Sequence, residues 1–194
     1  DITDKSIKEG FENAFIPGRL EAVSENPLVI IDGGHNEGCI TALKNYIEEN
    51  LKDKSITALL GFMKDKDYES AIKIIAPYCK SIVFTRADDL RGESAENLSV
   101  CARKLCSSIY AENDRKKSFR KAMSLLSEDG ALLCAGSFYL ISEIREYFYW
   151  APPFFDKNNI IYPLSFVGKG FLFFKKVNIC QQRLNTDKMK FPFI

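Results

Sequence analysis

Short, uninterrupted apolar runs alternate with amphipathic segments over most of the chain. The runs cover residues 28–31, 56–60, 81–84, 108–111 and 131–135. Because apolar residues are nearly continuous in them rather than alternating with polar ones, we interpret these runs as strands that are covered on both faces of a sheet. Before the first run, residues 6–14 are expected to form a short helix, and the stretch IPGRLEAV predicts a turn and then a strand.

Between the apolar runs, apolar residues recur at helical spacing. Each segment places them on one face, as follows: Ile40, Leu43, Ile47 and Leu51; Tyr68, Ala71, Ile72 and Ile75; Leu98, Ala102 and Leu105; Phe119, Ala122, Met123 and Leu126; Leu140, Ile141, Ile144 and Phe148. A strand followed by a helix, five times over, predicts a doubly wound α/β fold. Right-handed crossovers then place helices on both faces of the sheet.

The pattern changes at residue 150. We interpret residues 150–194, which are rich in Phe, Tyr, Pro and Asn, as an irregular aromatic-rich tail. Its apolar stretch 160–174 is interrupted by Pro163 and Lys169. Because a membrane-spanning helix needs about 20 mostly apolar residues, we expect no membrane span. The sequence begins with Asp1 rather than Met, and we expect it to be part of a longer chain.

Composition and charge exclude several classes of protein. The hydrophobic share of 46% and the charged share of 27% are those of an ordinary globular domain. A net charge of +1 gives no electrostatic reason to expect nucleic acid or an anionic membrane as partner. The six cysteines are scattered and only one histidine is present, so we expect reduced thiols, a cytoplasmic location and no metal site.

Polar residues gather where the first apolar run ends. In NPLVIIDGGHNEG, residues 26–38, the apolar residues lead directly into Asp32, two glycines, His35 and Asn36. Ligands of open α/β sheets bind beyond the carboxyl ends of strands, and a carboxylate there can bind ribose hydroxyls. Asp32 is equally suited to a turn or a helix cap, and His35 to an anion or to a simple loop hydrogen bond. We interpret Asn36 as the N-cap of the next helix.

Two further loops follow strands at the same edge. GFMKDKD offers Lys64 and Lys66 to anions, although it also suits a solvated charged turn. In AGSFYLISEIR, Ser137 opens a helix whose free backbone N–H groups form an anion site. Arg19 is a fixed positive charge suited to phosphate. The sequence contains neither GxxxxGK[ST] nor GxGxxG, so these loops can complete a nucleotide site but cannot build one alone.

Four motifs together resemble the C-terminal domain of folylpolyglutamate synthase and dihydrofolate synthase, in the Mur ligase superfamily. They are PGRLE, DGGHN, GFMKDKD and GSFYLISEIR, where that family usually has DGAHN, G-x-x-x-DKD and GSLYLVGEVR. The resemblance implies a Rossmann-like, three-layer α/β/α domain over residues 17–149, with a mostly parallel six-stranded sheet and one antiparallel edge strand after Arg19. Residues 1–16 then end an interdomain linker, and residues 150–194 match nothing in the family.

The resemblance also implies an activity. Such ligases use ATP and Mg²⁺ to convert a carboxylate into an acyl phosphate, which the amine of L-glutamate then attacks. The acid is folate or dihydropteroate. The phosphate loop and most metal ligands belong to an amino-terminal ATP-binding domain. We therefore expect this chain to be inactive alone and to be one domain of a monomeric enzyme.

Motif position assigns the nucleotide side of the site. Arg19 is expected to contact the ATP phosphates and Asp32 the ribose. His35, as the catalytic residue, is expected near the acyl phosphate or the incoming glutamate.

The glutamate side is assigned to Lys66 and Ser137, with Tyr139 packed beside it. These assignments require Arg19, Asp32, His35 and Ser137 to lie along one edge of the sheet. Two alternatives stay open: a Mur-type peptidoglycan ligase domain with a different acceptor, and a non-catalytic fragment that binds a nucleotide or a partner.

Overall fold

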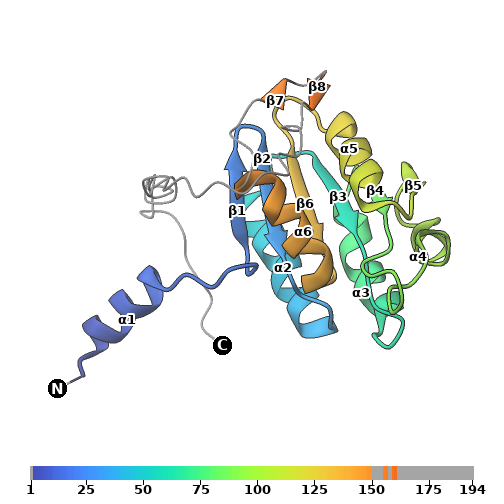
Figure 1. Cartoon of the computed structure of the whole chain (residues 1–194). Helices are drawn as coiled ribbons and strands as arrows, with labels where there is room; N and C mark the ends of the chain where they lie inside the picture. Colours follow the sequence, from blue (N-terminus) through green and yellow to red (C-terminus); the bar gives the residue numbers. More distant parts are fainter. Residues whose placement is uncertain (1, 150–154, 157–158, 161–194) are drawn as a thin grey trace, which may run out of the picture. The chain divides into compact units, whose positions relative to one another are not determined.

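A computed structural model describes residues 2–149, 155–156 and 159–160 (Figure 1). The elements follow one another as α1 (Asp4–Asn13), β1 (Glu21–Glu25), β2 (Leu28–Asp32), α2 (Glu37–Asn50), β3 (Ile56–Leu60), α3 (Tyr68–Ile75), the 3₁₀ helix η1 (Ala76–Tyr78), β4 (Ser81–Phe84), α4 (Ala95–Ala102), β5 (Ile109–Ala111), α5 (Arg115–Leu125), β6 (Ala131–Ala135) and α6 (Phe138–Tyr149). The predicted alternation of strands and helices is confirmed.

Six strands form one sheet in the order β1-β2-β6-β3-β4-β5. β1 pairs with β2 antiparallel, and every other neighbouring pair is parallel. The predicted mostly parallel sheet with an antiparallel edge strand is therefore confirmed. β6 lies between β2 and β3, so the last strand of the sheet along the chain sits at its centre.

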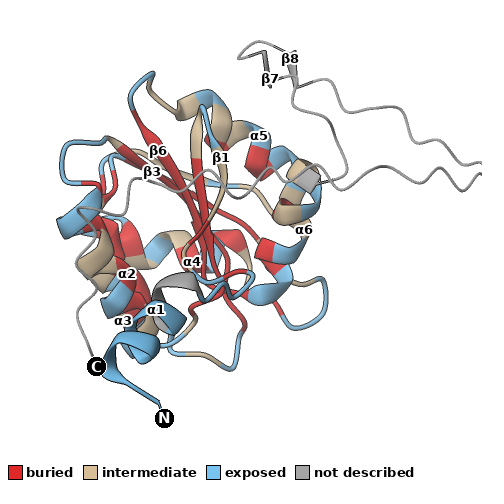
Figure 2. Cartoon of the chain, turned by 90° about the vertical axis from the view of Figure 1, so that its left-hand side faces the viewer, coloured by how far each residue is buried: buried red, intermediate tan, exposed pale blue. Residues whose placement is uncertain are grey.

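Helices cover both faces of the sheet (Figure 1). One apolar cluster joins the sheet to α2, α3 and α4, and a second joins it to α5 and α6. Alternate residues of each strand enter opposite clusters: Ile30 of β2 faces the first, and Val29 and Ile31 face the second. Both faces are thus buried, as the red strands of Figure 2 show, and this explains the uninterrupted apolar runs. Each such side chain contributes about 1.5–3 kcal/mol through burial.

One predicted core position is wrong. Leu105 was expected on the helical face with Leu98 and Ala102, but α4 ends at Ala102 and Leu105 is 37% exposed. The Cys106 amide donates to the Ala102 carbonyl at 3.1 Å, so the chain turns toward β5 there and Cys106 is buried instead. The helical spacing does not predict the position of Leu105 because α4 ends at Ala102, before that residue.

The predicted tail is described in two short pieces. β7 (Phe155–Asp156) and β8 (Asn159–Ile160) pair antiparallel. The remainder of residues 150–194, with most of the apolar stretch 160–174, lies outside the described residues. Within the described part of the chain, no helix has the length and apolar character needed to cross a membrane.

Candidate functional site

The loops that follow β2, β3 and β6 leave the sheet at one level. Asp32 at the end of β2 and Leu60 at the end of β3 both pair with Ala135 at the end of β6. β1 runs the other way and begins at Glu21, opposite Ile31, so the turn before β1 reaches the same edge. We call this side of the sheet the carboxyl edge. It brings the loops that hold Arg19, Asp32, His35 and Ser137 together.

Asp32 organises the turn before β1. Its side chain is 6% exposed, and Oδ2 accepts a hydrogen bond from the Leu20 amide at 2.8 Å. Oδ1 accepts from the Gly34 amide at 2.6 Å. Leu20 has a φ of +44°, which is uncommon for a residue with a side chain, so this turn needs support. The turn role that the sequence left open for Asp32 is therefore present. Each carboxylate oxygen has a second lone pair for a ligand hydroxyl.

Arg19 lies against the start of α6. Its side chain is exposed, and its guanidinium lies over the Phe138 ring, 4.6 Å from the centroid. Gly33 allows this arrangement, because a Cβ there would lie 2.6 Å from the same ring. The Gly33 amide also donates to the Gly18 carbonyl at 2.8 Å. The turn before β1, the end of β2 and the start of α6 thus meet at one place.

His35 is half-buried at the start of α2. Its Nδ1 lies 3.1 Å from the Gly33 carbonyl oxygen, which requires the proton to be on Nδ1. Nε2 of the neutral ring is then an acceptor. The predicted N-cap is confirmed: Asn36 Oδ1 accepts from the Cys39 amide at 2.9 Å.

Ser137 caps α6. The side chain is 3% exposed, and Oγ accepts from the Tyr139 amide at 3.2 Å. The preceding Gly136 has a φ of +104°, and a Cβ there would lie 2.5 Å from the Gly61 carbonyl oxygen. The loops after β3 and β6 are therefore in close contact. Tyr139 is 54% exposed at this edge.

The loops after β3 and β4 are joined to each other. The Lys64 amide donates to the Arg91 carbonyl at 3.0 Å, and its ammonium donates to the Leu90 carbonyl at 3.3 Å. Lys64 is therefore used within the fold, whereas the Lys66 ammonium lies on the surface, 3.3 Å from Asp65. Sequence reasoning missed Arg91, whose exposed guanidinium lies 6.0 Å from the centroid of the Tyr139 ring. The available signal was the charged stretch TRADDLRGES, which follows the strand at residues 81–84.

A buried ion pair was also missed. Glu21 is 3% exposed and accepts from the Gly18 amide at 2.7 Å and from Arg145 Nε at 3.0 Å. Glu21 ends the motif PGRLE and Arg145 ends GSFYLISEIR. The pair fixes α6 to the turn that holds Arg19. These two motif residues thus have a structural role within the domain.

The described residues offer no metal site: among residues 2–149, 155–156 and 159–160, no three His, Cys, Asp or Glu side chains gather closely enough to hold an ion. The five cysteines in this part of the chain are free thiols. Burial raises the pKa of the Cys79 and Cys134 thiols, so both are protonated and unreactive at neutral pH. Cys180 lies outside the described residues.

The fold and this edge define a class: a doubly wound α/β domain with an exposed arginine, a histidine and a helix N-terminus around the end of its second strand. The chain belongs to the family described as Mur ligase, glutamate ligase domain, whose sequence profile matches residues 18–138. The resemblance seen in the motifs is therefore confirmed.

Relatives and solved structures agree with this membership. A dihydrofolate synthase/folylpolyglutamate synthase of Bacillus subtilis (strain 168) is 30% identical over 145 residues, 75% of this chain and 33% of the relative. The UDP-N-acetylmuramoyl-L-alanyl-D-glutamate–2,6-diaminopimelate ligase of Helicobacter pylori (strain J99) is 33% identical over 139 residues, 68% of this chain and 30% of the relative.

A solved bifunctional folylpolyglutamate synthase/dihydrofolate synthase with Mn, AMPPNP and L-glutamate bound has a TM-score of 0.65 and 26% identity. The match covers 74% of this chain and 34% of that structure. The chain thus spans about a third of the length of these proteins.

Proposed function

We propose that this chain is the C-terminal domain of an ATP-dependent ligase that adds L-glutamate to folate or dihydropteroate through an acyl phosphate. The observation that supports it most is the meeting of Arg19, Asp32, His35 and the start of α6 at the carboxyl edge. The names of the Bacillus relative and of the solved structure point to the same reaction.

On the nucleotide side, Arg19 binds the ATP phosphates. Its guanidinium is exposed yet held by the Phe138 ring, so little side-chain freedom is lost when a phosphate binds. Asp32 accepts hydrogen bonds from the ribose hydroxyls while it holds the turn of Leu20. His35 lies near the acyl phosphate, and its Nδ1 hydrogen bond to the Gly33 carbonyl leaves Nε2 as the ring nitrogen that interacts with the incoming amine.

On the side of the site assigned to L-glutamate, the carboxyl edge carries two cations and one aromatic ring: Lys66, Arg91 and Tyr139. Lys66 and Arg91 bind the carboxylates of L-glutamate, and the exposed Tyr139 ring packs beside its side chain; the surface position of the Lys66 ammonium and the Arg91–Tyr139 contact support this. Ser137 keeps the N-terminus of α6 in place there. The acid itself becomes an electrophile only after phosphorylation, so these residues serve the second step of the reaction.

The rest of the enzyme is proposed to lie in another domain. ATP is bound between the two, and Mg²⁺ neutralises the phosphates through ligands of that second domain. Within this chain we propose that residues 1–16 belong to the interdomain linker, residues 17–149 to the ligase domain and residues 150–194 to a separate tail. A single copy of each domain makes a complete site.

ATP-dependent phosphate release tests the proposal. The full reading frame that encodes this chain is assayed with L-glutamate and either dihydropteroate or a folate, and residues 1–194 alone serve as the control. We expect glutamate-dependent release from the full protein and none from the control. Turnover by the control would contradict a site built from two domains. Phosphate release that does not depend on L-glutamate would contradict the assignment of L-glutamate as the amino acid that is added.

A Mur-type ligase is the second candidate, because the Helicobacter relative has the higher identity of the two. The same assay with a UDP-N-acetylmuramoyl peptide as the acid separates the two. Release with that acid only would replace the folate proposal. If no acid supports ATP-dependent phosphate release, the chain is instead a domain that binds a nucleotide or a partner without catalysis.

A further inference from the structure

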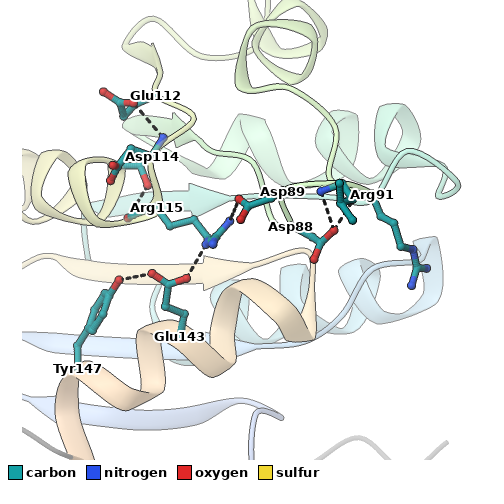
Figure 3. Close-up of polar contacts among 10 residues, drawn as sticks. Asp88, Asp89, Arg91, Glu112, Asp114, Arg115, Glu143 and Tyr147 are labelled. Carbon is teal, nitrogen blue, oxygen red and sulfur yellow. Dashed lines mark hydrogen bonds and ion pairs between the residues drawn. The ribbon is translucent and has the colours of Figure 1, made fainter.

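A chain of polar side chains joins the loop after β4 to helices α5 and α6 (Figure 3). Arg115, the first residue of α5, donates from Nη1 to Asp89 Oδ1 at 2.8 Å and from Nε to Glu143 Oε2. The Tyr147 hydroxyl donates to Glu143 Oε1 at 2.6 Å. The two carboxylates raise the pKa of Arg115, so its guanidinium stays charged. One side chain thus holds two elements that are far apart in sequence.

The loop that Arg115 holds contains a tight turn at residues 88–92. Asp88 Oδ1 accepts from the amides of Leu90 at 3.1 Å and Arg91 at 2.7 Å. The Gly92 amide donates to the Asp88 carbonyl, and a Cβ on Gly92 would lie 2.4 Å from that oxygen. The turn is therefore a compact unit that is expected to move as a whole. Figure 3 shows its Arg91 side chain pointing away from Arg115.

The other partner of Arg115 belongs to the helix that begins at the carboxyl edge. Glu143 lies four residues after Tyr139 on α6, so the two share one face of the helix. Arg115 binds Glu143 with one nitrogen and Asp89 with another, which sets the separation between α6 and the turn. Lys64 holds the turn to the loop after β3 through the Leu90 and Arg91 carbonyls, and Arg115 holds it to α6. The Arg91 guanidinium then lies 6.0 Å from the centroid of the Tyr139 ring.

We propose that Arg115 is a positioning residue for the acceptor amino acid. It fixes the turn at residues 88–92 against α6 and so sets the Arg91–Tyr139 pair at the spacing that receives the amino acid. The inference rests on the proposed function for the identity of the ligand, but its mechanical part stands on the contacts alone. Arg115 itself is not expected to touch substrate.

A substitution at Asp89 tests this proposal more selectively than one at Arg115, because Arg115 also binds Glu143. Asp89→Ala removes the ion pair of Arg115 with Asp89 and leaves its ion pair with Glu143 intact. The Asp89 side chain is 83% exposed, so its removal leaves no buried cavity. An exposed ion pair contributes only about 0–1 kcal/mol, so the fold should survive. Asp89→Glu restores a carboxylate, and Asp53→Ala is a matched control because Asp53 is another exposed aspartate in a loop.

Amide hydrogen exchange of this chain, followed by NMR, measures the mechanical part. We expect exchange at Arg91 and Gly92 to become about two- to fivefold faster in Asp89→Ala, as the loss of one exposed ion pair allows, with core strand amides unchanged. Asp89→Glu should return most of the protection and Asp53→Ala should change nothing. Unchanged exchange at residues 90–92 in Asp89→Ala would overturn the proposal.

Steady-state kinetics of the full protein measure the positioning part. We expect Asp89→Ala to raise the KM for the amino acid about fivefold, with the KM for ATP and kcat within about twofold of wild type. Faster exchange with an unchanged KM for the amino acid would also overturn the proposal. If the wild-type full protein releases no phosphate with any acid substrate, the proposed function fails. The hydrogen-exchange experiment alone then still decides whether Arg115 holds the turn.

Discussion

Asp32→Asn tests whether the carboxylate at the end of β2 holds the turn before β1. The substitution keeps the shape of the side chain but removes its charge and one acceptor oxygen. In the wild type, the amides of Leu20 and Gly34 donate to the two oxygens at 2.8 and 2.6 Å. Asparagine has one oxygen, and its NH₂ group would face the second amide, so at most one of the two hydrogen bonds survives.

The size of the effect follows from these two bonds. A hydrogen bond to a charged group contributes about 1.5–3 kcal/mol and a neutral one about 1 kcal/mol. Losing two of the first kind and keeping one of the second costs about 2–5 kcal/mol. We expect the low half of that range, about 2–3 kcal/mol, because the bond from Leu20 is only partly buried. In a domain of this size that lowers Tm by about 4–12 °C.

Urea and thermal unfolding of this chain, followed by circular dichroism, give the measurement. Asp53→Asn is the control, since Asp53 is exposed and its substitution should change the free energy of unfolding by less than about 0.5 kcal/mol. An Asp32→Asn protein as stable as the control would refute the turn role. No nucleotide is present, so this experiment is independent of ribose binding. That second role predicts a higher KM for ATP when Asp32→Ala is made in the full protein.

Three further results are expected. Gly136→Ala should destabilise the chain by about 2 kcal/mol or more, because Gly136 has a positive φ and a Cβ there would clash with the loop after β3. Gly10→Ala is the control and should be neutral or stabilising, since nothing lies near a Cβ at Gly10. Equal unfolding midpoints of the two variants in urea would contradict this prediction. Backbone N–H groups lower the pKa of the helix caps Asp67 and Asp114, so the stability they give is present above the unfolded value of about 3.9 and lost as pH falls through the lower folded value. The urea midpoint should therefore drop between pH 5 and about pH 3, and Asp67→Asn should reduce that drop. Cys134 should not react with a thiol reagent until the chain unfolds, and fast labelling of the native protein would show that its strand is open.

The fold was predictable because its strands are buried on both faces. A residue such as Ile30 or Leu59 is apolar whichever face it joins, so the runs 28–31 and 56–60 are visible without knowledge of the pairing. The sequence could not reveal that β6 lies between β2 and β3, because strand order depends on where each crossover packs. The family resemblance supplied the antiparallel edge, and the structure confirmed it.

The site was predictable as a set of residue types but not as a set of contacts. Asp32 was found from its position after a strand, whereas its bonds to the turn of Leu20 required coordinates. Glu21 and Arg145 are 124 positions apart, and Arg115 and Glu143 are 28 apart, so no local spacing pattern could join them. Contacts of this kind are set by tertiary packing, and single-sequence reasoning has no access to it.

Burial divides the motif residues into two groups. Glu21 and Ser137 are almost fully buried, and their hydrogen bonds within the domain support the turn before β1 and the start of α6. Arg19 and Tyr139 are exposed and keep polar or aromatic surface available to a ligand. Because the buried group holds the backbone beneath the exposed one, a ligand would meet side chains whose main-chain positions are already fixed. Preorganisation of this kind lowers the cost of binding charged groups, since dipoles and cations need not reorient when phosphate or carboxylate arrives. A substitution in the buried group should therefore weaken both stability and ligand binding, whereas one in the exposed group should weaken binding alone.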